Sequence, residues 1–324
     1  MSLPIFTSTT TAEEVAAVLS QKIKGRNVLI TGPTIGGIGF ETARVLAKYA
    51  ALVILAGYNL ERLKLAEDEI KTEAPSATLR TVKLDLSSLS SVRAAAEEVN
   101  AYPEPLHVLI NNAATAAMIF KLSPDNLEMG MATNHIGPFL LTNLLVPKLL
   151  ASSTEGCIPR VVFVSSTAHA GQPQLDVTAL ANSDPAKHIP MLAYRHSKAA
   201  NILTAIELSK RSNGKVKAYS LHPGVIFTNG LKAKENRRGL IAAGILTNEG
   251  LPNTEKLRGW KTLAQGAATT IAAAFDPRLE ASPGAYLCDG MEANDKVAPH
   301  ASDPGTAAAL WAATEEIVGE KFML

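Results

Sequence analysis

Residues 27–39 read NVLITGPTIGGIG, and this stretch decides the fold. The apolar run from Asn27 to Thr31 is typical of a buried parallel strand, and apolar residues with helical spacing follow from Ile38 to Tyr49. Glycines between a strand and a helix let the backbone approach a pyrophosphate, while the helix amino terminus supplies N–H groups and positive potential. A ligand-free glycine turn is the alternative, but the strand–turn–helix setting favours nucleotide binding.

The same alternation of apolar runs and amphipathic segments continues along the chain. We expect strands over residues 52–56, 78–84, 107–111, 160–165 and 215–221. Helices are expected over residues 60–73, 88–99, 124–150 and 192–212, with a bend at Gly137-Pro138 in the third of them. This order predicts an α/β fold with a single Rossmann-like, doubly wound parallel sheet and helices on both faces.

The chain has no linker that would divide it. Residues 1–324 are therefore expected to form a single dinucleotide-binding and catalytic domain. Thr11-Ala-Glu-Glu14 has the form of a capping box, with a hydroxyl at the cap and a carboxylate three residues later. Residues 1–24 are accordingly expected to form an N-terminal helical extension.

The composition excludes several classes of protein. With 47% hydrophobic and 19% charged residues, the chain is neither disordered nor fibrous. A net charge of +1 supplies no field that would attract nucleic acid or an anionic membrane. Cys157 and Cys288 are too few for a disulfide framework and lack metal-ligand spacing, so no metal is expected. Without a secretory signal or a run of about eighteen apolar residues, we expect a cytoplasmic protein with no membrane span.

The end of the second expected strand bears on the choice of cofactor. An acidic residue there would hydrogen-bond a free ribose 2′-hydroxyl and repel a 2′-phosphate. This chain instead reads Ala56-Gly-Tyr-Asn59, with no carboxylate before Glu61. NADP(H) is therefore favoured, with NAD(H) left open, and Arg62 is the nearest candidate to bind the phosphate or else a solvated helix residue.

Tyr194 and Lys198 are four residues apart, on one face of an expected helix. A phenol has an ordinary pKa near 10, and a neighbouring cation favours the phenolate, which lowers that pKa toward the working range of a general acid–base. Alone, such a pair is more often an ordinary feature of a helix surface. Its meaning depends on the motifs around it.

Several motifs accompany the pair in a fixed order. They are the glycine turn, Asp85-Leu86, Asn111-Asn-Ala-Ala114, Asn134, Val164-Ser-Ser166, Tyr194 with Lys198, and Pro223-Gly224. Together, from about Gly25 to Leu287, they resemble the classical short-chain dehydrogenase/reductase family. The stretch that begins Asn134-His-Ile-Gly, together with Tyr286-Leu-Cys-Asp289 and Leu310-Trp311, resembles the retinol-dehydrogenase-like branch, fungal members above all. Fungal relatives would suggest a place in secondary metabolism.

The resemblance implies a role for each catalytic position. Tyr194 would exchange a proton with the substrate oxygen, and Lys198 would lower the pKa of Tyr194 and bind the nicotinamide ribose. Ser166 would hydrogen-bond the substrate oxygen and stabilise the charge that develops there. Asn134 would help to hold a water that links Lys198 to solvent. The alternative to a catalytic role for Ser166 is a structural one, in which its hydroxyl stabilises a turn at the end of the strand.

The resemblance also implies where the cofactor lies. Its contacts would come from Gly32, Thr34, Ile35, Gly37, Ile38, Gly39, Tyr58, Asn59, Arg62, Asp85, Leu86, Asn112, Ala113, Tyr194, Lys198, Pro223, Gly224, Val225 and Thr228. Three departures from the family pattern are visible. The glycine loop is one residue longer than usual, which leaves open whether Gly36 or Gly37 matches a given family glycine. Tyr58 stands where NADP-dependent relatives often have arginine, and Ala114 replaces the usual glycine.

Substrate identity is expected to reside in two segments outside these motifs. Residues 229–260 form a long loop region of basic and apolar residues, which would cover an apolar substrate or else dock on the body or another subunit. The insertion between Ser166 and Tyr194 holds His169, Gln172, Gln174, Asp176 and His188, which line a pocket wall or form a surface excursion.

The function implied by the resemblance is that of an NADP-dependent carbonyl reductase. Such an oxidoreductase reduces an apolar ketone or aldehyde, or oxidises the alcohol, with Tyr194 as general acid/base. One alternative is a reductase of an imine or C=C bond, and another is a non-redox cyclase or nucleotide-sensing protein on the same fold. The complete set of Ser166, Tyr194 and Lys198 argues against a decayed site. The partner is a small apolar carbonyl or alcohol, and a homo-oligomer is left open.

Overall fold

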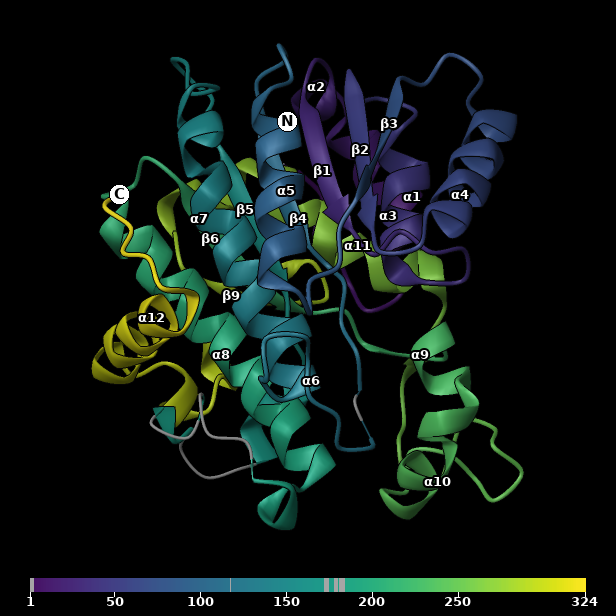
Figure 1. Ribbon diagram of the computed structural model, residues 1–324. Coiled ribbons are helices and arrows are strands. Elements are labelled where there is room, and N and C mark those ends of the chain that lie inside the picture. Colours follow the sequence, from purple (N-terminus) through teal and green to yellow (C-terminus); the bar gives the residue numbers. More distant parts are fainter. Residues whose placement is uncertain (1–2, 117, 172–174, 178–179, 181–183) are drawn as a thin grey trace.

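The structure is a computed structural model that describes residues 3–116, 118–171, 175–177, 180 and 184–324 (Figure 1). Within these residues, eight strands form one sheet in the order β10-β9-β6-β5-β4-β1-β2-β3. Each neighbouring pair is parallel except β9 and β10. The strands are β1 (Asn27–Thr31), β2 (Leu52–Gly57), β3 (Leu79–Lys83), β4 (Val108–Asn111), β5 (Arg160–Val164), β6 (Lys217–His222), β9 (Tyr286–Cys288) and β10 (Met291–Glu292). Strands β2 and β3 add to one side of β1, and β4, β5 and β6 add to the other. The boundary between β1 and β4 is the topological switch point, where doubly wound folds bind their ligands.

Helices cover both faces of the sheet because successive strand residues point to opposite sides. Leu29 packs in one apolar core, while Val28 and Ile30 pack in the other. The first core lies under α5 (Leu89–Asn100), α7 (Gly137–Leu150), α8 (Pro190–Arg211) and α12 (Pro304–Val318). The second lies under α1 (Ala12–Val18), α2 (Ser20–Ile23), α3 (Ile38–Leu46), α4 (Leu60–Glu73) and α11 (Leu263–Phe275). The prediction of a Rossmann-like α/β fold is confirmed.

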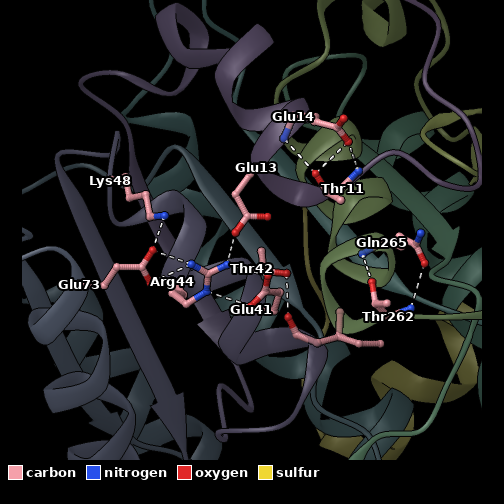
Figure 2. A network of polar contacts seen from close by, with 11 residues as sticks. Thr11, Glu13, Glu14, Glu41, Thr42, Arg44, Lys48, Glu73, Thr262 and Gln265 are labelled. Atoms are coloured by element: carbon pink, nitrogen blue, oxygen red, sulfur yellow. Dashed lines mark hydrogen bonds and ion pairs between the residues drawn. The ribbon is translucent and has the colours of Figure 1, made fainter.

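A polar network fixes α1 to the body of the protein (Figure 2). Arg44 on α3 forms ion pairs with Glu41 on its own helix, with Glu73 on α4 and with Glu13 on α1. The Arg44 side chain is 18% exposed, so these pairs lie partly out of solvent. Thr11 makes the predicted capping box with Glu14 at the start of α1.

The expected helix over residues 124–150 is wrong at its start. The chain first makes a turn in which Ser123 Oγ accepts hydrogen bonds from the N–H groups of Asp125 and Leu127. Helix begins with α6 (Met129–Met131) and passes through a π-helix (Ala132–Ile136) into α7. Pro138 lies in the first turn of α7 and has no N–H to donate to the carbonyl four residues before it. The wider π-helical turn therefore precedes Pro138, where the sequence predicted a simple bend.

Several elements were not expected from the sequence. Residues 229–260 are not one loop but contain α9 (Asn229–Lys232) and α10 (Lys234–Ala242), which Figure 1 shows beyond the carboxyl ends of the strands. A second, two-stranded sheet pairs β7 (Val225–Ile226) with β8 (Trp260–Lys261) at the base of this region. Short 3₁₀-helices span Thr167–Gly171, Pro185–Lys187, Pro277–Ala281, Asn294–Lys296 and Pro299–Ala301. Among the described residues, no helix has the length and apolar character needed to cross a bilayer.

Candidate active site

The glycine turn after β1 packs so closely against the end of β4 that two of its positions have no room for a side chain. Gly32 has φ +69°, and a Cβ built on it would lie 2.8 Å from the Cβ of Ala113. A Cβ on Gly39 would overlap the side-chain amide of Asn112. Gly37 begins α3, and no side chain caps that helix end, so its first N–H groups are available to an anion. Thr34, Ile35 and Ile38 belong to the same turn, as predicted.

The ends of β1 and β4 are held together by a threonine that the sequence argument missed. Thr31 Oγ1 accepts hydrogen bonds from the N–H groups of Asn112 and Ala113, each at 3.0 Å. Asn112 Nδ2 in turn donates to Thr31 O at 2.9 Å. These bonds fix the backbone of the predicted ribose-contacting residues beside the glycine turn.

The end of β2 presents a cation at the predicted adenosine position. Asn59 Oδ1 caps α4 by accepting from the N–H of Arg62, and Arg62 Nη1 donates to the Tyr58 hydroxyl at 3.2 Å. The Tyr58 side chain is 62% exposed, and Arg62 is exposed as well. A guanidinium here is placed to pair with a phosphate on the adenosine ribose.

Asp85 and Leu86 form the turn after β3. The Asp85 carboxylate accepts from both the N–H and the hydroxyl of Ser87, at 2.9 and 2.7 Å. Leu86 is buried, and its carbonyl lies so close to Gly137 that a Cβ there would collide with it. The turn that would border adenine is therefore rigid and packed against α7.

The predicted catalytic side chains meet at the carboxyl end of β5. Ser166 follows that strand, and its hydroxyl hydrogen-bonds Tyr194 and accepts from the N–H of Ala168 at 3.1 Å. Lys198 is buried, lies one turn along α8 from Tyr194, and places its Nζ 5.6 Å from the centre of the tyrosine ring. Ser165 is structural, since its hydroxyl donates to Lys198 O at 2.6 Å. The three predicted residues are thus brought together.

Burial shifts the pKa of both ionisable groups, the Tyr194 phenol and the Lys198 ammonium. Desolvation raises the pKa of Tyr194, and the hydrogen bond from Ser166 acts in the opposite direction. The Nζ of Lys198 donates a hydrogen bond to Val164 O at 2.8 Å, and the expectation that Lys198 lowers the pKa of Tyr194 stays a prediction. Burial lowers the pKa of Lys198 itself to about 8. At neutral pH the Tyr194 phenol is protonated, and the Lys198 side chain is in its charged ammonium form in most molecules.

Asn134 lies in the π-helix and joins two segments of the site. Its Nδ2 donates to Thr115 O and to Ser197 Oγ, while its Oδ1 accepts from the N–H of Thr115. Ser197 Oγ donates to Tyr194 O at 2.7 Å. The side chain therefore ties the segment after β4 to the catalytic helix, and the proposed water relay stays a prediction.

The predicted nicotinamide contacts follow β6. Pro223 and Gly224 lead into β7, which begins at Val225, and Thr228 precedes α9. Gly224 has φ +101°, and the chain of Lys261 runs beneath it to an ion pair with Asp289. These residues form one edge of the site, between β6 and α9.

Two further segments border this edge. Asn229 Nδ2, at the start of α9, donates to Ile35 O in the glycine turn, so the predicted lid contacts the cofactor loop. In the insertion after Ser166, His188 contacts the Phe120 ring edge-on at 5.0 Å. Gln172 and Gln174 of the same insertion lie outside the described residues.

Sequence reasoning placed His169 only in a pocket wall or a surface excursion, and it missed His222 altogether. His169 Nδ1 lies 2.6 Å from Ser166 O, and His222 Nδ1 accepts from the N–H of Thr167 at 3.3 Å. The available signal was position, since one histidine follows the serine pair by three residues and the other directly precedes Pro223.

Known proteins share this arrangement of motifs. The short chain dehydrogenase family model matches residues 26–239. "Short-chain dehydrogenase TIC 32 B, chloroplastic" of Brassica napus is 36% identical over 286 residues, which cover 87% of this chain and 85% of the relative. Retinol dehydrogenase 12 of Mus musculus is 34% identical over 302 residues, covering 92% and 88%. The crystal structure of an uncharacterized protein from Mycobacterium Paratuberculosis has a TM-score of 0.71 and 30% identity, covering 93% of this chain and 96% of that one.

The family model covers the glycine turn, Ser166, Tyr194 and Lys198 in one continuous match. The relatives extend that likeness over most of the chain, and the solved structure shows the same fold. The resemblance drawn from the motifs is thereby confirmed. The chain belongs to the short-chain dehydrogenase family of oxidoreductases and has retinol-dehydrogenase-like relatives.

Proposed function

We propose that the protein is an NADP(H)-dependent reductase of an apolar ketone or aldehyde, able to oxidise the corresponding alcohol in reverse. The observation that carries the proposal is the hydrogen bond between Ser166 and Tyr194 beside the buried Lys198. Because burial keeps the Tyr194 phenol protonated, it holds the proton that carbonyl reduction consumes.

Each side chain has one task in this reaction. A reduced nicotinamide cofactor, when bound, would supply the hydride for the carbonyl carbon. The Tyr194 hydroxyl gives its proton to the carbonyl oxygen, and Ser166 donates a hydrogen bond to that oxygen. Ser166 Oγ accepts from the N–H of Ala168, which leaves its own proton available for donation. The Lys198 ammonium stabilises the phenolate that remains, until the phenol is protonated again.

The choice of NADP(H) rests on the end of β2. Arg62, held by Tyr58, supplies a positive charge, and Asn59 caps α4 without bringing a carboxylate to this point. A ribose 2′-phosphate would meet the guanidinium and would meet no opposing anion at the strand end.

The proposal of an apolar substrate is supported by aromatic and apolar contacts in and next to the lid segment, residues 229–260. Phe120 contacts His188, and Met118 packs against Gly239 of α10, so the lid lies over an aromatic and apolar segment. Below it, Phe227 contacts Trp260 across the small sheet. A relative is named for retinol, an apolar alcohol, which agrees with such a lining.

The proposal is tested by following the absorbance of NADPH and NADH with a panel of apolar ketones, aldehydes and imines. Oxidation of NADPH by ketones or aldehydes, faster than that of NADH, is the expected result. Turnover of imines or alkenes alone would assign the protein to that other chemistry. Nucleotide binding without turnover across the panel would overturn the reductase and favour a sensing role.

A further inference from the structure

We propose that His169 and His222 are positioning residues that clamp one peptide bond, between Ser166 and Thr167, in the orientation the catalytic serine requires. The proposal rests on the function proposed above. It concerns residues that touch the serine's backbone rather than the substrate.

Both polar groups of this single peptide are held by imidazole nitrogens. His169 Nδ1 lies 2.6 Å from Ser166 O, which is the peptide's carbonyl oxygen. The N–H of Thr167, which belongs to the same peptide, donates to His222 Nδ1 at 3.3 Å. Ser166 O also accepts a hydrogen bond from the backbone N–H of His169 at 3.3 Å. Rotation of the peptide plane would break both imidazole bonds at once, so the two rings reinforce this backbone bond in fixing the orientation of the peptide.

The bonds require opposite tautomers of the two histidines. His169 Nε2 accepts from the N–H of Ala298 at 3.3 Å, and a backbone N–H can only donate. His169 therefore carries its proton on Nδ1 and donates it to Ser166 O. His222 Nδ1 is an acceptor, so its proton resides on Nε2. Burial lowers the pKa of both rings, that of His222 to about 4, which keeps them neutral at physiological pH.

The clamp reaches the reacting atoms through the serine. The next N–H along the chain, that of Ala168, donates to Ser166 Oγ at 3.1 Å, so a tilt of the preceding peptide would move the donor that places the hydroxyl. His169 is itself immobilised, with less than 2% of its surface exposed and its ring edge-on to Tyr286 at 5.3 Å. His222 directly precedes Pro223, so it couples the serine to the nicotinamide-side turn.

Asparagine and glutamine variants separate this role from simple packing. An Asn amide places its polar atoms near the position of the imidazole Nδ1, whereas a Gln amide reaches the position of Nε2. His169→Asn and His222→Asn are expected to retain kcat within about threefold of wild type. The matching Gln and Leu variants should lose at least about tenfold in kcat, with the affinity for NADPH within twofold, because one displaced donor at an oxyanion costs this much or more.

The matched control is His107, at the opposite end of the sheet. Its Nδ1 also accepts from a backbone N–H, that of Asn27 at 3.0 Å, and burial lowers its pKa to about 4. His107→Leu should lower the melting temperature and leave kcat unchanged. Unchanged kcat in His169→Leu and His222→Leu, or equal losses in their Asn and Gln variants, would overturn the proposal.

A Ser166→Ala background tests the route of the effect. If the histidines act through the serine, adding His222→Leu to Ser166→Ala should cause no further loss in single-turnover rate. A loss as large as in the wild-type background would contradict the clamp.

Long-range proton–nitrogen spectra of the ¹⁵N-histidine-labelled protein test the tautomers without any turnover. They should show His169 protonated on Nδ1 and His222 on Nε2. The reverse tautomers would refute the clamp even in an active enzyme. The predicted tautomers in a protein that reduced no carbonyl would retain the clamp and refute the proposed function instead.

Discussion

Replacement of Arg62 by glutamine should change the cofactor preference of the enzyme. The guanidinium stands at the end of β2, oriented by its bond to the Tyr58 hydroxyl at 3.2 Å. A charge-assisted hydrogen bond contributes about 1.5–3 kcal/mol, and the exposure of Arg62 places it at the low end of that range. A loss of about 1.4 kcal/mol is a tenfold loss of affinity. Arg62→Gln should therefore weaken NADPH binding by about tenfold and leave NADH binding unchanged.

The assay is a fluorescence titration of each variant with NADPH and with NADH at a fixed ionic strength. Lys64→Gln is the matched control, because Lys64 lies on the same helix, is exposed, and pairs with Asp68. Tyr58→Asp should shift the preference in the same direction by a second route, strengthening NADH binding through the ribose hydroxyls and weakening NADPH binding by repulsion. Equal losses for both cofactors in Arg62→Gln, or a change below twofold for NADPH, would refute the reasoning.

Three further outcomes follow from the same structure. Arg44→Met removes the cation that pairs with the carboxylates of Glu13, Glu41 and Glu73 (Figure 2). It should lower the free energy of unfolding, measured in urea, by about 2 kcal/mol, and a change below about 0.5 kcal/mol would count against the network. Burial lowers the pKa of His135 from 6.5 to about 3, so unfolding takes up a proton as pH falls below 6.5. The melting temperature should therefore fall more steeply from pH 7 to 4.5 than in His135→Gln, and parallel curves would contradict this. Gly39→Ala places a methyl group against Asn112 and should weaken cofactor binding at least about tenfold in the same titration, whereas unchanged affinity would place the pyrophosphate elsewhere.

The sequence predicted the central fold well because its strands are short, apolar and separated by clear turn signals. The strand from Asn27 to Thr31 and the helix from Leu60 to Glu73 agree with the structure residue for residue. The start of the helix expected over residues 124–150 was misplaced, since apolar periodicity does not reveal a turn closed by a serine hydroxyl such as that of Ser123. The helix α12 was not predicted, although its Trp311 packs edge-on against Phe139 on α7 at 4.8 Å.

The candidate site was predictable where a motif names the residue type. Ser166, Tyr194 and Lys198 meet as expected, because the end of one strand and one face of one helix determine their positions. The direction of the Tyr194 pKa shift was not predictable, since it depends on how deeply the phenol is buried. The histidine clamp joins residues about fifty positions apart, and spacing carries no signal for such a contact. Location in the cell, assembly and metabolic role stay predictions.

The most direct test of the central claim is a single-turnover measurement of hydride transfer in Tyr194→Phe. Phenylalanine retains the packing of the ring and removes the hydroxyl that would give its proton to the substrate oxygen. With NADPH bound as tightly as in wild type, the rate should fall at least about a hundredfold, the usual contribution of a positioned general acid. A rate within a few fold of wild type would contradict the assignment of Tyr194 as the proton donor.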